Sequence, residues 1–282
     1  MNPSTGSGNP TGSGNPTGSG NPTPPFEVEH LTRVYTTGRR KVLALDDVSL
    51  TVRRGQRLGI VGESGSGKST LIRLMASLDK PTSGTVRFDG RVVSGVPERH
   101  LGFLRASVQL VLQDPRSSLN PRMKVGDVVA EPLRSPIIRK ERQKVDRATR
   151  VREVLDAVGL PADAAGRYPH EFSGGQRQRI AIARALAPSP EVLIADEAVS
   201  ALDVSVRAQV LNLLMDLVDE LGITLLFVSH DLAVVRHVCP DAVVMQAGRI
   251  VEAGPTHQLF SAPAHPYTAR LVAAIPAFRS RT

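Results

Sequence analysis

The residues best placed to do chemistry form a glycine-rich run that ends in lysine and serine. The run is Gly62-Glu63-Ser64-Gly65-Ser66-Gly67-Lys68-Ser69, which fits the spacing G-x-x-x-x-G-K-[ST] and follows an apolar segment ending at Val61. Glycines at this spacing let successive backbone N–H groups surround phosphate oxygens, and the lysine reaches the β and γ phosphates. A glycine-rich turn with a solvated lysine is the alternative. The position between a predicted strand and a predicted helix favours a phosphate-binding loop.

Each candidate phosphate ligand in this loop is a glycine, a residue with a hydroxyl group or the positively charged lysine. They are Gly62, Ser64, Gly65, Gly67, Lys68, Ser69 and Thr70. The helix predicted to follow directs its N-terminal N–H groups and the positive end of its dipole at the same anion. The Ser69 hydroxyl is also a candidate ligand of Mg²⁺.

Two carboxylates follow a short apolar run farther along the chain. The run from Val192 to Ala195 predicts a buried strand, and Asp196 and Glu197 come directly after it. At the carboxyl end of a strand, Asp196 would bind Mg²⁺ directly or through water, and Glu197 would act as general base toward an attacking water. Two acidic residues at a strand end are also common as solvated turn residues, so this interpretation depends on the phosphate-binding loop.

A third motif is Ser173-Gly174-Gly175-Gln176, which precedes a helical run from Ile180 to Leu186. Small residues at a helix N-terminus leave backbone N–H groups accessible to an anion. Alone, this sequence is an ordinary loop. Its position about 20 residues before Asp196 makes it specific.

In this order, the motifs resemble the Walker A, signature and Walker B sequences of ATP-binding cassette (ABC) ATPases, and the resemblance extends from residue 26 to about residue 260. It implies a P-loop α/β core, ATP and Mg²⁺ as ligands, and ATP hydrolysis. It also implies that Ser173, Gly174, Gly175 and Gln176 act across a dimer, on the ATP held by the partner.

The resemblance gives roles to four further residues. Tyr35 matches the aromatic residue that stacks on adenine, although a packed surface tyrosine is the alternative. Gln113 matches the catalytic glutamine that binds and senses Mg²⁺ and links the ATPase to its membrane partner. Asp203 is the last residue of Ser200-Ala201-Leu202-Asp203, which matches the D-loop. His230 matches the histidine that contacts the γ-phosphate and takes part in catalysis with Glu197.

Three strings outside the shared motifs resemble the ATPase subunits of oligopeptide and dipeptide importers, in particular the F subunit. They are residues 113–122 (QDPRSSLNPR), 168–172 (YPHEF) and 265–268 (HPYT). Two positions depart from that family. Ala198 stands where the family usually has proline, and Cys239 is the only cysteine, so the iron–sulfur centre of some such subunits cannot form.

This resemblance implies partners and a location. The expected partners are a second ATPase, with a heterodimer favoured and a homodimer open, two membrane permease subunits and, indirectly, an extracytoplasmic solute-binding protein. The chain is expected to lie peripherally on the cytoplasmic face of the membrane.

Importers of nickel, glutathione or other small solutes are alternatives. A soluble ABC protein of ribosomes or DNA is disfavoured by the single Walker A motif and the lack of sustained heptads, and no nucleic-acid partner is expected.

Composition agrees with an anionic ligand. The formal net charge is +8 over 282 residues, which suits a nucleotide, a nucleic acid or an acidic membrane surface. Aromatic residues make up 4% of the chain, which argues against single-stranded nucleic acid. A single cysteine fits a reducing compartment, and neither a signal peptide nor a membrane-spanning run is recognisable, so the cytoplasm is the expected location.

Parallel strands joined by helices are needed to bring these motifs together. Apolar runs predict strands at Arg57–Val61, Val192–Ala195, Leu225–Ser229 and Ala242–Met245, and Val48–Val52 is also strand-like. The predicted fold class is α/β, a P-loop core with an antiparallel β subdomain and an inserted helical subdomain.

Helical periodicity and composition set the remaining boundaries. Leu71, Leu74, Met75 and Leu78 predict a helix from Lys68 toward Pro81, and Val206, Val210, Leu213, Leu217 and Leu221 predict one over about 205–221. Val151, Val154, Leu155 and Val158 fall at helical spacing within the helical subdomain, at about 115–172. Residues 1–25 predict a disordered tail, 26–260 the ATPase domain and 261–282 a family-specific extension. The stretch from Gly248 to Pro276 is expected to lie outside the core.

Overall fold

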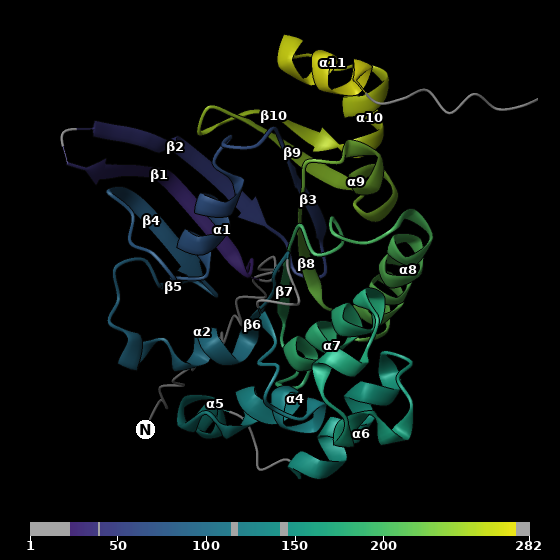
Figure 1. The fold of residues 1–282 in the computed structure, drawn as a ribbon. Coiled ribbons are helices and arrows are strands. Elements are labelled where there is room, and N and C mark those ends of the chain that lie inside the picture. The colour runs from purple at the N-terminus through teal and green to yellow at the C-terminus, as the bar shows by residue number, and fades with distance from the viewer. Residues whose placement is uncertain (1–22, 39, 114–117, 142–145, 275–282) are drawn as a thin grey trace, which may run out of the picture.

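Two sheets form the framework of the protein (Figure 1). The computed structural model describes residues 23–38, 40–113, 118–141 and 146–274, so the predicted tail over 1–25 lies almost wholly outside the described residues. One sheet has the strand order β10-β9-β3-β8-β7-β6 and the other the order β2-β1-β4-β5. This architecture confirms the predicted fold class.

The six-stranded sheet is parallel except at one edge. Its parallel strands are β3 (Arg57–Val61), β6 (Val108–Val111), β7 (Val192–Asp196), β8 (Thr224–Ser229) and β9 (Asp241–Gln246), and β10 (Arg249–Pro255) pairs antiparallel with β9. The predictions for β3, β7, β8 and β9 are confirmed to within one residue at each end. Their apolar runs are continuous because both faces of the sheet are covered.

Alternate residues of these strands enter two different cores. Ile60, Ile194 and Val228 lie in a cluster with the first helix and the antiparallel sheet. Leu193 and Phe227 face the opposite way, into a cluster with the later helices. Because successive side chains point to opposite faces of a strand, one sheet packs against two hydrophobic layers.

The antiparallel sheet is built by the N-terminal part of the chain. Its strands are β1 (Phe26–Thr37), β2 (Arg40–Val52), β4 (Ser83–Phe88) and β5 (Arg91–Val92). Val48–Val52, predicted as strand-like, is the end of β2. Phe26 and Phe88 meet edge to face in the core of this layer, with ring centroids 5.0 Å apart.

The helix α1 (Lys68–Met75) is shorter than the sequence suggests. Ser77 adopts a positive φ of 50°, and the N–H of Leu78 bonds back to the Arg73 carbonyl at 2.8 Å. This turn ends the helix at Met75 and leaves Leu78 51% exposed, so the prediction that the helix includes Leu78 and runs toward Pro81 is wrong.

Helices form most of the described residues between β6 and β7. They are α4 (Val125–Arg134), α5 (Pro136–Glu141), α6 (Arg147–Ala157) and α7 (Gly174–Leu186), with short 3₁₀ turns at Ala162–Gly166 and Pro169–Glu171. Val151, Val154, Leu155 and Val158 are all buried, as their spacing predicts. Before β6, a 3₁₀ turn (Glu98–His100) and α2 (Gly102–Ser107) complete the first half.

The helix α8 (Val204–Glu220) buries a face that shares only Val210 and Leu217 with the face predicted from the sequence. Its buried residues are Val210, Leu211, Leu214, Met215, Leu217 and Val218. Leu213 is only partly buried, and Leu221 lies beyond the helix and is 54% exposed. Leu211, Leu214, Met215 and Val218 complete the buried face because they meet the core that also contains Val210 and Leu217.

The C-terminal elements pack on the core. They are α9 (Leu232–Val238), β10, α10 (Thr256–Ser261) and α11 (Pro266–Ala273). Leu259 is 5% exposed and Tyr267 is 3% exposed, and both belong to the cluster under the six-stranded sheet. The expectation that Gly248–Pro276 lies outside the core is therefore wrong for the described part of that stretch, which ends at residue 274.

Candidate functional site

The phosphate-binding loop connects β3 to α1 and depends on glycine at its two ends. Gly62 has φ 154°, and a Cβ there would lie 2.2 Å from the Met245 carbonyl oxygen. Gly67 has φ 105°, and its Cβ would lie 2.7 Å from the Ala44 carbonyl oxygen. Other residues would clash with neighbouring backbone at both positions, so strands β2 and β9 fix where this loop runs.

The N-terminus of α1 is open toward the loop. Gly67 is its N-cap and supplies no side-chain cap, so the N–H groups of the first turn have no capping side chain. The Ser66 carbonyl accepts the Gly248 N–H at 2.9 Å, which ties the middle of the loop to the β9–β10 turn. Ser64, Gly65 and Ser69 are exposed and can be reached by a phosphate, whereas Gly62 and Lys68 are buried.

Lys68 is folded back over the loop. Its side chain is buried, with the residue only 5% exposed, and Nζ donates to the carbonyl oxygens of Gly62 at 2.7 Å and Glu63 at 2.8 Å. Burial lowers the pKa of Lys68, and the charges of Glu197 and Asp196 oppose that change. A desolvated cation satisfied by only two carbonyl groups is well prepared to exchange them for phosphate oxygens.

Asp196 lies at the end of β7, next to this loop. The Ser69 hydroxyl donates a hydrogen bond to its carboxylate, while Oδ1 is buried and has no hydrogen-bond partner among the described residues. Burial raises the pKa of Asp196, and the neighbouring charge of Glu197 raises it further. A hydroxyl and a carboxylate with an unused oxygen are hard oxygen donors, and this donor set fits Mg²⁺.

Glu197 and His230 meet beside Asp196. His230 Nδ1 lies 3.0 Å from Glu197 Oε1. Glu197 has φ 48°, a left-handed conformation that its N–H secures by donating to the Val228 carbonyl at 2.9 Å. The Glu197 side chain is 20% exposed and that of His230 is 56% exposed, so the carboxylate is shielded on one side and reachable by water on the other.

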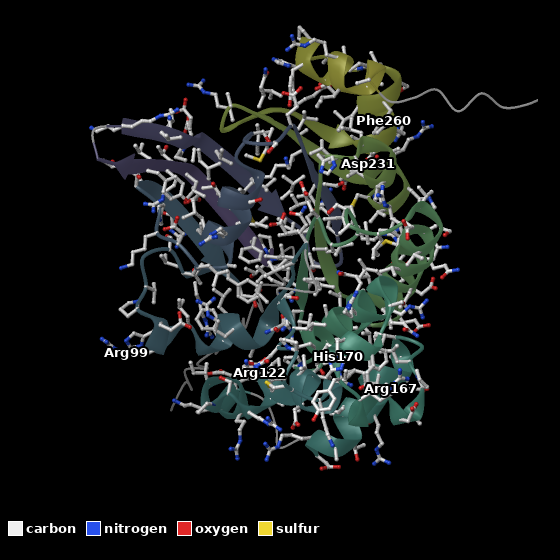
Figure 2. All side chains as sticks on the ribbon, viewed as in Figure 1. Arg99, Arg122, Arg167, His170, Asp231 and Phe260 are labelled. Atoms are coloured by element: carbon white, nitrogen blue, oxygen red, sulfur yellow. The ribbon has the colours of Figure 1, made fainter. Side chains whose placement is uncertain are left out.

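Arg207 connects the two loops around this pair. Its guanidinium donates to the carbonyl oxygens of Ser200 at 3.4 Å and Leu202 at 3.2 Å, and to Asp231 at 3.4 Å. Asp231 lies at the start of α9, well away from His170 in the helical region (Figure 2). Sequence reasoning missed Arg207, because the only signal is an arginine one turn after Asp203 and its partners come from separate loops.

The signature residues begin α7. Ser173 is the N-cap, and its hydroxyl accepts the Gln176 N–H at 3.3 Å while the Gln176 side chain accepts the Ser173 N–H at 2.9 Å. A Cβ on Gly175 would lie 2.3 Å from a methyl of Val206, so glycine allows α7 to pack closely against α8. Ser173 and Gln176 are exposed.

The structure brings some predicted residues together and leaves others apart. The loop, Asp196, Glu197 and His230 form one site, whereas α7 packs with α4, α6 and α8, on the other side of the molecule from α1 (Figure 1). Gln113 follows β6 and is exposed, and Asp203 is the exposed N-cap of α8. Residues 114–117 lie outside the described residues.

Tyr35 is half-buried on β1. Its hydroxyl donates to Asp79 at 2.7 Å, and the Arg33 guanidinium lies 4.4 Å from the centre of its ring. The arginine therefore lies against the aromatic ring, where it makes a cation–π contact. Ala198, the other position of note, is 2% exposed and packs in the core.

A P-loop on a parallel sheet, an adjacent carboxylate pair and a separate signature helix define an ATP-binding cassette. Residues 45–200 match the family described as ABC transporter, and residues 251–282 match the family described as Oligopeptide/dipeptide transporter, C-terminal region. The chain belongs to the ABC transporter family and is an ABC-type, nucleotide-binding ATPase.

The relatives agree with this assignment. A probable peptide ABC transporter ATP-binding protein of Sinorhizobium fredii is 51% identical over 257 residues, which cover 89% of this chain and 72% of the relative. A dipeptide transport ATP-binding protein of Haemophilus influenzae is 50% identical, with coverage of 84% and 72%. An oligopeptide transport ATP-binding protein of Bacillus subtilis is 49% identical, with coverage of 89% and 82%.

Solved structures show the same fold. The ATP-binding cassette MJ0796, in a dimeric post-hydrolysis state bound to ADP and Pi, superposes with a TM-score of 0.73 at 32% identity and covers 82% of this chain and 98% of that one. The cbiO1 protein of Clostridium perfringens has a TM-score of 0.73 at 29% identity, with coverage of 85% and 92%. Within the described ranges, the helices are all too short or too polar to cross a bilayer.

Proposed function

We propose that this chain hydrolyses ATP to power the import of peptides through an ABC transporter. The observation that carries the proposal is the match of residues 251–282 to the C-terminal region of oligopeptide and dipeptide transporters. Identity of about 50% to proteins named for peptide transport supports the same substrate class.

The site residues divide into phosphate binding and water activation. The loop residues Gly62, Ser64, Gly65, Gly67, Lys68, Ser69 and Thr70 bind the phosphates, and Tyr35 stacks on the adenine. Glu197 takes the proton of the attacking water, and His230 holds the carboxylate and contacts the γ-phosphate.

Ser69, Asp196 and Gln113 are the residues that would hold Mg²⁺. The buried, unpartnered Oδ1 of Asp196 supports this assignment. Bound Mg²⁺ supplies neutralisation of phosphate charge in this class of reaction. The chain itself orients the phosphates through Lys68 and excludes bulk water from the buried side of Glu197.

A second ATPase completes the site. Ser173, Gly174, Gly175 and Gln176 lie at the start of a helix that packs with α4, α6 and α8. By the resemblance to ABC ATPases, these residues serve the ATP of a partner, and the exposed Asp203 belongs to the same interface. The dimeric state of the solved relative supports this arrangement. The partner is a similar but non-identical chain, although this chain carries every motif needed for two equal sites.

The remaining partners are membrane proteins. Two permease subunits dock on the helical region that follows Gln113, and an extracytoplasmic solute-binding protein delivers substrate to them. The chain therefore lies peripherally on the cytoplasmic face of the membrane. Nucleic acid is not a partner.

Uptake measurements in the source cell test this function. Replacing the chromosomal copy with Glu197→Gln should reduce the uptake of labelled di- and oligopeptides to the level of a deletion, while Glu220→Gln, an exposed carboxylate on α8, should leave uptake intact. Intact peptide uptake with loss of nickel or glutathione uptake would contradict the substrate assignment.

Purification of the intact transporter tests the partners separately. Mass spectrometry should find this chain once, together with one further ATPase and two permeases. Two copies of this chain without a second ATPase would contradict the heterodimer and leave the ATPase assignment intact.

A further inference from the structure

The C-terminal segment makes a direct contact with the phosphate-binding loop. The hydroxyl of Tyr267 on α11 accepts the backbone N–H of Glu63 at 3.0 Å, across 204 residues of sequence. Tyr267 is 3% exposed and packs in the core beneath the six-stranded sheet. A buried phenol therefore holds the second residue of the loop.

Glu63, whose backbone N–H bonds to Tyr267, also binds the side chain of Lys68. The carbonyl oxygen of Glu63 accepts Lys68 Nζ at 2.8 Å and the Ser66 N–H at 3.2 Å. Tyr267, Glu63 and Lys68 thus form a continuous hydrogen-bonded chain from the C-terminal helix to the phosphate-binding cation. Hydrogen bonds in such a series fix one another's geometry.

The phenol is itself rigidly placed. Glu252 on β10 accepts the backbone N–H groups of Ala264 at 2.8 Å and His265 at 3.1 Å, which anchors the turn before α11. His265 Nδ1 then accepts the Tyr267 N–H at 3.1 Å and caps the helix. Within the string at residues 265–268, the histidine therefore starts the helix, the proline occupies its first turn, and the tyrosine reaches the loop.

We propose that Tyr267 is a positioning residue for nucleotide binding. Its hydroxyl fixes the Glu63 peptide, so that the C-terminal segment sets the conformation in which the loop and Lys68 meet the phosphates. The inference rests on the proposed role of this loop in binding ATP. It assigns to the C-terminal segment a function inside the ATPase site of its own chain.

Tyr267→Phe tests the proposal, because it removes the hydroxyl and keeps the buried ring. We expect the dissociation constant for ATP, measured by equilibrium titration of the full chain, to rise about 3- to 10-fold, which corresponds to the loss of one hydrogen bond. Tyr168→Phe is the matched control, since Tyr168 lies in the helical region and is 37% exposed, and it should bind ATP as the original protein does.

Hydrogen exchange separates positioning from general stability. In Tyr267→Phe, amides of residues 62–68 should exchange faster while those of β7 and β8 keep their protection. Unchanged ATP affinity and unchanged loop exchange would overturn the inference, as would faster exchange throughout the core. Failure of the original protein to bind ATP would instead contradict the proposed function.

Discussion

His230 Nδ1 and Glu197 Oε1 lie 3.0 Å apart at the ends of two adjacent parallel strands. Asp196 is paired in register with Val228, so the residues that follow, Glu197 and Ser229-His230, leave the sheet at the same edge. The left-handed backbone at Glu197 turns its side chain toward the histidine. Sheet register, strand length and one unusual dihedral angle thus set the position of the carboxylate.

Replacing Glu197 with Gln should separate ATP binding from hydrolysis. The amide keeps the shape of the side chain but cannot accept a proton, and loss of a general base typically slows turnover about 10²- to 10⁴-fold. Equilibrium titration should give an unchanged ATP affinity, and phosphate release by the assembled transporter should fall by that factor. The control Glu220→Gln, which removes the same charge from an exposed site, should hydrolyse normally.

Replacing Lys68 with Ala should weaken nucleotide binding itself. Lys68 is a buried cation whose nitrogen lies within reach of the loop carbonyls, and charge-assisted hydrogen bonds of this kind contribute about 1.5–3 kcal/mol. The dissociation constant for ATP should therefore rise about 10- to 100-fold. Lys80→Ala removes an exposed lysine and serves as the control. Equal ATP affinity in the two variants would contradict the role of Lys68.

Much of the site could be predicted from the sequence because its parts are local. The strands before Gly62 and before Asp196 are buried on both faces, so unbroken apolar runs mark them to within one residue. The phosphate-binding loop is likewise defined by glycine spacing, since neighbouring backbone at Met245 and Ala44 leaves no room for a Cβ at its two ends.

Features that depend on distant packing could not be predicted in the same way. The end of α1 depends on a positive φ at Ser77, a residue whose type does not indicate a left-handed turn. Arg207 draws its partners from two separate loops, and Tyr267 bonds a residue 204 positions away. No periodicity in a single sequence carries such information.

Asp196 should make the stability of the nucleotide-free protein depend on pH. Burial raises its pKa above the ordinary value of 3.8, so the native state binds the proton more tightly than the unfolded state does. The contribution of Asp196 to the free energy of unfolding is therefore greatest at low pH, and it is lost as the pH rises through the raised pKa. Asp196→Asn should remove this loss of stability. Denaturant unfolding at about pH 7 should therefore give the nucleotide-free variant a larger free energy of unfolding than the original protein.

The control for this experiment is Asp216→Asn, an exposed carboxylate on α8. It should leave both the stability and its pH dependence unchanged. If the free energy of unfolding of Asp196→Asn changed with pH in parallel with that of the original protein, ionisation of the buried Asp196 would not destabilise the native state. Stabilisation by ATP with Mg²⁺ should nevertheless be smaller in Asp196→Asn, because the variant lacks a metal-binding carboxylate.

Cys239 should report on unfolding as a single chemical probe. It is the only cysteine among the 282 residues. It is 2% exposed, and burial raises its pKa to about 12. Since the thiolate is the reactive form, a thiol with this pKa should react about 10³-fold more slowly near pH 8 than an unperturbed cysteine, even before restricted access is considered.

With Ellman's reagent, the native protein should therefore react slowly and the denatured protein at once. Saturating ATP should slow the native reaction further if labelling requires global opening, because ligand binding stabilises the folded state. Rapid stoichiometric labelling of the native chain, absent in Cys239→Ser, would show that the core around Cys239 opens without global unfolding.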